Sequence, residues 1–117
     1  MNYEFSKSEK KIVRQVIETA LQRDFEASIM EVDSIIQQWK SKKLDNRDAY
    51  QEIYRKVKEN DKYIARMYND ITGSKYMLTL QGLLANKVIS ETDLDGFSEK
   101  TRDDILKIMN IFRNDRL

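Results

Sequence analysis

The sequence predicts an all-α fold, namely a four-to-five-helix bundle built on a long antiparallel helical hairpin and closed by shorter C-terminal helices. Three observations predict it. The 117 residues contain no proline, the residue that most strongly interrupts helices. Apolar residues recur at steps of three and four, the period of an amphipathic helix. No segment shows the sustained alternation of apolar and polar residues that is typical of a strand.

Length and composition predict one folded domain spanning residues 1–117. A chain of this length can bury enough surface for one core. Hydrophobic residues make up 40% of the chain and charged residues 35%. This balance is typical of a folded domain with a highly charged surface, because disordered chains have fewer apolar residues and no helical period.

The first predicted helix covers residues 7–42. Ser6 and Glu9 have the spacing of a capping box, in which the two residues satisfy free amides at a helix start. Asp24 could cap a second helix, so a break near residue 24 is an open alternative. The second half of the helix carries a heptad-like stripe, called here the first seam: Phe25, Ile29, Val32, Ile36 and Trp39.

The second predicted helix covers residues 46–72, after a turn in which Asp45 or Asn46 can cap it. It carries a second seam, consisting of Tyr50, Ile53, Val57, Ile64, Met67 and Ile71. Asn60 occupies a position where an apolar residue is due. Either Asn60 fixes the register by a buried hydrogen bond, or the helix restarts there. We expect both seams to be buried inside the bundle.

Three shorter elements are predicted towards the C-terminus. Gly73 is expected to end the second helix in the left-handed conformation, with a short apolar helix following at 74–86. A helical turn is predicted at 90–95 and a last helix at 98–113. The expected inward positions of the last helix are Ile105, Leu106, Ile108, Met109 and Phe112.

The composition excludes whole classes of catalytic chemistry. Without cysteine and histidine the chain has no thiolate nucleophile, no Ser-His-Asp triad and no zinc-finger site. Residues 91–96 resemble the start of a calcium-binding loop, but Arg102 stands where such a loop carries its bidentate acid. Capping by the acidic side chains explains this segment better. We therefore predict no enzymatic activity, no catalytic residues, no cofactor and no metal site.

The formal net charge of +1 gives the whole molecule no attraction towards nucleic acid or anionic membranes. No stretch is apolar enough for a signal sequence or a membrane span, so we expect no membrane partner and a cytoplasmic location. A local basic patch at the hairpin tip could bind phosphates and stack a base. This candidate nucleic-acid patch consists of Trp39, Lys40, Lys42, Lys43 and Arg47.

Tyrosines cluster in the second long helix, where tyrosine, methionine and arginine together are typical of protein interfaces. The candidate interface consists of Tyr54, Arg66, Met67 and Tyr68. Two long seams also carry more apolar surface than short helices can cover. The sequence therefore predicts a protein-interaction or regulatory module that acts through helix-helix contacts, with another protein or a second copy as partner. A nucleic-acid-binding regulator that uses the basic tip is the alternative.

Overall fold

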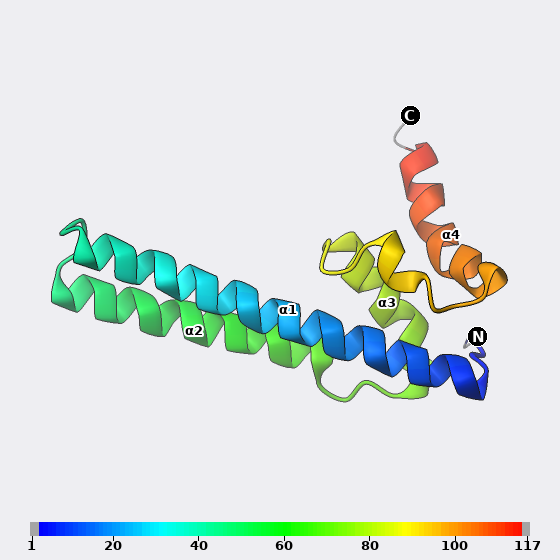
Figure 1. Cartoon of the computed structure of the whole chain (residues 1–117). Helices are drawn as coiled ribbons and strands as arrows, with labels where there is room; N and C mark the ends of the chain where they lie inside the picture. Colours follow the sequence, from blue (N-terminus) through cyan, green and yellow to red (C-terminus); the bar gives the residue numbers. More distant parts are fainter. Residues whose placement is uncertain (1–2, 116–117) are drawn as a thin grey trace. The chain divides into compact units, whose positions relative to one another are not determined.

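The structure is a computed structural model that describes the backbone of residues 3–115 and the side chains of residues 3–107. It confirms the all-α class, with the long helical hairpin formed by the first two helices (Figure 1). No strand occurs in the described residues. The elements are α1 (Lys7–Lys40), α2 (Asn46–Tyr68), the 3-10 turn η1 (Gly73–Lys75), α3 (Tyr76–Ala85), the 3-10 turn η2 (Glu91–Leu94) and α4 (Glu99–Asp115).

The chain divides into two compact units, where the sequence predicts one domain. We call Leu21–Asn69 the hairpin unit, and the residues up to Ala20 together with those from Asp70 onward the terminal unit. The helix α1 contributes residues to both units, because the boundary after Ala20 lies within it. The predicted alternative of a break near residue 24 is wrong, since α1 is continuous there. The side chain of Asp24 accepts a hydrogen bond from the Tyr68 hydroxyl at 2.5 Å, so it serves a tertiary contact.

Capping residues fix where the long helices begin. The amide of Glu9 donates to Ser6 Oγ at 3.2 Å, and Ser6 Oγ donates to Glu9 Oε1 at 3.3 Å. The amide of Asp48 donates to Asp45 Oδ1 at 2.8 Å, which makes Asp45 the N-cap of α2. Both contacts satisfy amides that lack partners in the first turn of a helix.

The ends of both long helices differ from the predicted ones. The helix α1 ends at Lys40 and not at residue 42, since Lys42 is left-handed with φ 69°. The helix α2 ends at Tyr68 and not at residue 72, and the left-handed residue behind it is Asp70, with φ 59°. Gly73 has no positive φ and begins η1. An acidic residue can adopt the left-handed conformation, although glycine adopts it at lower cost.

The core of the terminal unit draws on the segment before α1, on α1, α3, η2 and α4, and on the loops before η2 and α4. Its buried hydrophobic side chains are Phe5, Val13, Val16, Ala20, Tyr76, Leu80, Leu83, Ile89, Leu94, Phe97 and Ile105. Phe5 lies among three other aromatic rings, with centroid distances of 4.8 Å to Tyr3, 6.1 Å to Phe97 and 6.5 Å to Tyr76. The side chains of Ile108, Met109 and Phe112, which the sequence predicts to be inward, lie outside the described residues.

The C-terminal elements fall within a few residues of their predicted ranges. The predicted helix at 74–86 is divided into η1 and α3. In η2, the Asp93 carboxylate accepts the Ser90 amide at 2.8 Å. The helix α4 starts behind Ser98, whose Oγ accepts the Thr101 amide at 3.2 Å. The Glu9 carboxylate also accepts the Ser98 amide and hydroxyl, both at 3.4 Å, and so links the start of α1 to the start of α4.

Candidate functional site: the apolar face of the hairpin

The hairpin unit has a much thinner core than the terminal unit. Every residue of the hairpin unit is described, and its buried hydrophobic side chains are Ile35 and Ala49. Polar groups also join α1 to α2: Asn60 Nδ2 donates to Ser28 Oγ at 2.8 Å, and Lys56 pairs with Glu31 at 3.5 Å. The helix α2 is continuous at Asn60, so it does not restart there, and the Asn60 hydrogen bond to Ser28 is part-buried.

The expectation that both seams are buried is wrong for five residues, whereas the other residues of the two seams are half-buried. The exposed ones are Phe25, Ile29, Trp39, Tyr50 and Val57. The residues of α1 that contact α2 or are buried against it include Asp24, Ser28, Glu31 and Ile35. Each of them comes one position before a member of the first seam. One residue corresponds to about 100° of helical rotation. The first seam thus lies beside the line of contact with α2, where Val32 and Ile36 are half-buried.

The same offset of one residue applies to α2. Tyr50 follows the buried Ala49, and Val57 follows Lys56, which pairs with α1. In both helices the apolar stripe is displaced by one residue in the same sequence direction from the residues that face the other helix. Because the two helices are antiparallel, this displacement places both stripes on the same side of the hairpin. The result is one continuous surface, called here the apolar face. It consists of Phe25, Ile29, Val32, Ile36 and Trp39 of α1 and Tyr50, Tyr54, Val57 and Ile64 of α2.

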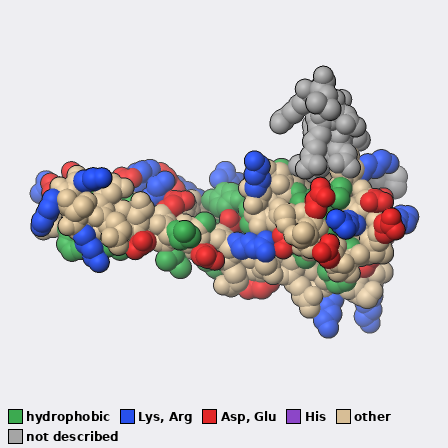
Figure 2. Space-filling view, turned by 45° about the horizontal axis from the view of Figure 1, so that its top comes forward, with side chains coloured by type: hydrophobic (Ala, Val, Ile, Leu, Met, Phe, Trp, Pro, Cys, Tyr) green, Lys and Arg blue, Asp and Glu red, His purple; other side chains and the backbone are tan. Residues whose placement is uncertain are grey.

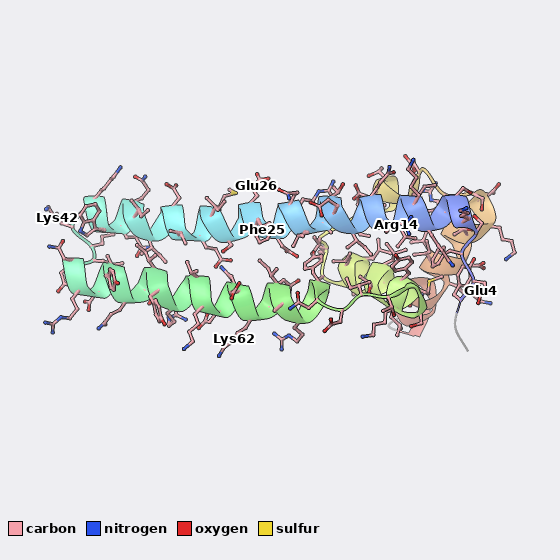
Figure 3. All side chains as sticks on the ribbon, turned by 90° about the horizontal axis from the view of Figure 1, so that it is seen from below. Glu4, Arg14, Phe25, Glu26, Lys42 and Lys62 are labelled. Atoms are coloured by element: carbon pink, nitrogen blue, oxygen red, sulfur yellow. The ribbon has the colours of Figure 1, made fainter. Side chains whose placement is uncertain are left out.

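Most side chains of the apolar face are exposed to an unusual degree for large hydrophobic residues. The exposed fraction is 75% for Tyr50, 68% for Ile29, 49% for Val57 and 43% for Phe25. Figure 2 shows separate groups of hydrophobic side chains at the lower edge of the hairpin, with charged and other side chains between and above them. Figure 3 shows Glu26 and Lys62 on the outer sides of α1 and α2.

The structure does not bring the four predicted interface residues together. Tyr54 lies on the apolar face and is exposed. Met67 is half-buried, and Arg66 precedes it on the other flank of α2. Tyr68 is half-buried, and burial, followed by its hydrogen bond to Asp24, raises the pKa of its hydroxyl.

The residues of the predicted nucleic-acid patch do lie together, at the end of α1 and the turn behind it. The indole Nε1 of Trp39 donates to Asn46 Oδ1 at 2.7 Å, which holds the ring against the start of α2. The four cations Lys40, Lys42, Lys43 and Arg47 are exposed. Asp45 and Asp48 lie within the same segment and reduce its positive potential.

The opposite side of the hairpin carries both polar and apolar groups, among them Ile35 and Leu44. It contains an open hollow of about 530 Å³ whose lining includes Ser34 and Asp48. These residues come one position before Ile35 and Ala49, so helical rotation places them on the side away from the apolar face. Charged groups of Glu31, Glu52 and Lys56 surround this hollow. Only the apolar face thus offers a continuous hydrophobic surface among the described residues of the hairpin unit.

Two acidic side chains of the turn at residues 91–95 bind other groups of the protein. Asp93 caps the turn, and Asp95 pairs with Arg102 at 3.6 Å. Within the described residues no three acidic side chains gather in a way that could hold a metal ion.

Phe25, Ile29 and Val57 belong to the predicted seams, but they are exposed and do not lie in a core. One signal for their position exists in the sequence. Ser28 and Asn60 can form a hydrogen-bonded pair between the helices, and their positions place both seams beside the contact line.

The described helices include none that is long and apolar enough to cross a membrane. The chain matches no protein family model, and no curated protein or solved structure was found to be similar to it.

Proposed function

We propose that the chain is a small cytoplasmic protein-interaction or regulatory module that binds its partner through helix-helix contacts on the apolar face. The observation that carries this proposal is the distribution of hydrophobic side chains in the hairpin unit. Two are buried, while seven large ones are exposed: Phe25, Ile29, Met30, Trp39, Tyr50, Tyr54 and Val57. All of them except Met30 belong to the apolar face.

The free energy available on this surface supports binding. Burying a large apolar side chain completely contributes about 1.5–3 kcal/mol. Large apolar side chains exposed along one face are typical of surfaces that bind another protein. A partner helix, or a pair of helices, would bury this stripe in the way that helices of a bundle bury one another.

Photocrosslinking at two adjacent positions tests the proposal. A benzoylphenylalanine would replace Tyr50 on the apolar face or Gln51, which lines the opposite hollow. In cells that express the full chain, we expect discrete crosslinked products from position 50 and not from position 51. Equal products from both positions, or none from position 50, would contradict an interaction through this face.

A second candidate function is nucleic-acid binding by the tip. It is favoured by one observation: within the described side chains, Lys40, Lys42, Lys43 and Arg47 form no ion pair and are free to contact phosphates. Filter binding at about 50 mM salt tests it, because phosphate contacts are strongest at low salt. Affinity that disappears when Lys42, Lys43 and Arg47 become glutamine would support this function, and no measurable affinity at that salt concentration would remove it.

A further inference from the structure

Charged residues border the apolar face at intervals of seven positions, and they define which partner fits it. On α1 these residues are Glu26, Asp33 and Lys40, and on α2 they are Arg47 and Asp61, with Tyr54 midway between them. Lys58 lies on the same flank of α2 outside this series, with its ammonium 6.0 Å from the centre of the Tyr54 ring. Residues seven apart lie on the same side of a helix, and such flanking positions form the ion pairs between helices that pack along a seam. Glu26, Lys40, Arg47 and Asp61 are exposed and form no ion pair within the described side chains.

The midpoints of the two series of charges lie at the same level along the hairpin. Position 33 is midway between Glu26 and Lys40, and position 54 is midway between Arg47 and Asp61. The ion pair of Glu31 with Lys56 sets the levels of the two antiparallel helices. Two residues closer to the tip on each helix, position 33 of α1 is therefore level with position 54 of α2. Both series therefore change sign about the same level of the hairpin.

A two-fold axis across the hairpin at this level would place opposite charges together. Lys40 would meet Glu26 of a second copy, and Arg47 would meet Asp61 of that copy, each about 10 Å from the axis. Each pairing occurs twice by symmetry. In this arrangement α1 packs against α1 of the second copy and α2 against its α2, so all neighbouring helices are antiparallel, as in an up-and-down four-helix bundle.

The other way of pairing the two faces has the tips at the same end and α1 against α2 of the second copy. In that arrangement Lys40 would lie beside Arg47, and Glu26 beside Asp61. Like charges would then meet at both ends of the overlap, which disfavours association. The charge pattern therefore discriminates between the two orientations.

We propose that the apolar face binds a second copy of the same chain, with the hairpins antiparallel and the two-fold axis at the level of Asp33 and Tyr54. This inference rests on the proposed function and specifies its partner. The overlap covers positions 26–40 of α1 and 47–61 of α2, which include Ile29, Trp39, Tyr50 and Val57. The axis also places Asp33 beside Asp33 of the second copy.

Sedimentation equilibrium of the purified full chain tests the proposal by a charge swap. We expect a dimer whose dissociation constant rises roughly tenfold or more at low salt in Lys40→Glu or in Glu26→Lys, because each change creates two like-charge contacts. In the double variant, Lys40→Glu with Glu26→Lys, opposite charges meet again with their positions exchanged. Its dissociation constant should therefore return to within a fewfold of that of the unchanged chain. Lys42→Glu is the matched control, because Lys42 lies in the turn outside the overlap.

Asp33→Asn supplies a second, independent measurement. It removes the like charges on the axis and keeps the size of the side chain, so we expect tighter dimers at low salt and a smaller difference at high salt. A weaker dimer in this variant would overturn the position of the axis. Equal weakening by Lys40→Glu and Lys42→Glu, or a double variant as weak as the single ones, would overturn the arrangement.

The failure of this proposal is distinguishable from the failure of the proposed function. A chain of 13.9 kDa that stays monomeric at every concentration measured would overturn the dimer. The crosslinked products from position 50 then decide the broader proposal. If these products contain a different protein and position 51 gives none, the interaction face stands and the second copy is excluded as its occupant.

Discussion

Phe5 is the residue on which the packing of the aromatic side chains in the terminal unit depends. It is 5% exposed, and its ring contacts those of Tyr3, Tyr76 and Phe97. The sequence gives little sign of this role, because Phe5 precedes the first helix and belongs to no periodic stripe. Its burial is decided by segments that are distant in the sequence.

We expect Phe5→Ala to lower the free energy of unfolding by about 3–5 kcal/mol, through lost burial and the cavity left behind. Urea unfolding followed by circular dichroism measures this change. Leu78→Ala, in α3, is the control, since Leu78 is 71% exposed and its loss should change stability by less than about 0.5 kcal/mol. Equal effects of the two substitutions would contradict the described core.

Glu9 links stability to pH at the residue scale. Hydrogen bonds from Thr101 and then from Ser98 and Ser6 hold the pKa of Glu9 below its ordinary value of 4.5. A carboxylate whose pKa is lowered by folding contributes stability above its ordinary pKa, and that contribution is lost as the pH falls through its folded value.

The Glu9→Gln variant should therefore be less stable than the unchanged chain at neutral pH, and the difference should shrink as the pH falls below about 4.5. Thermal unfolding at several pH values between about 7 and 3 measures this effect. Glu4→Gln is the control, because Glu4 is an exposed acid in the same segment. A difference between Glu9→Gln and the unchanged chain that grows on acidification would refute the role assigned to Glu9.

At the scale of the element, the turn between α1 and α2 is held by a small number of specific contacts. Asp45 caps α2, and Trp39 donates a hydrogen bond to Asn46 in its first turn. The left-handed Lys42 reverses the chain between them. The sequence predicts a cap at this position, because aspartate and asparagine accept free amides at helix starts.

We expect Asp45→Ala to destabilise the hairpin by about 0.5–2 kcal/mol, which is the usual effect of removing an N-cap side chain. The fluorescence of Trp39, the single tryptophan of the chain, reports on this end of the hairpin during urea unfolding. Lys43→Ala alters an exposed side chain of the same turn and should have little effect. An unchanged midpoint in Asp45→Ala would show that the cap does not contribute.

At the scale of the whole molecule, each unit is stabilised in a different way. The terminal unit has its own core of buried apolar side chains, whereas the hairpin unit has polar contacts between its helices and an exposed apolar face. Helical stability in proteins comes mainly from packing of the apolar stripe. The hairpin unit should therefore gain stability whenever its apolar face is covered.

A dimer formed through this face has a thermodynamic consequence, because association stabilises the folded state by mass action. The thermal midpoint reported by Trp39 should rise when the chain concentration is raised about a hundredfold, and Lys40→Glu should reduce that rise. Fluorescence melts at a series of concentrations provide the measurement. A midpoint independent of concentration would contradict association through the apolar face.

The sequence by itself determined the all-α class, the long hairpin, the cap at Ser6, a cap at Asp45 or Asn46 and the approximate ranges of the elements. These features follow from local rules, namely the helical period and the pairing of free amides with nearby side chains. The predicted ends of the elements were less accurate. The left-handed residue behind α2 is Asp70 and not Gly73, because residues other than glycine can also adopt this conformation.

Only the tertiary structure decided which way the two seams face. A helical period fixes which residues share a side of a helix, but it does not fix the rotation of that helix against its neighbour. Here polar contacts such as Asn60 with Ser28 occupy the line between α1 and α2. Each helix is rotated by the angle of about one residue from the packing that the seams predict, and several seam residues are therefore exposed. This rotation depends on contacts between residues that are distant in the sequence.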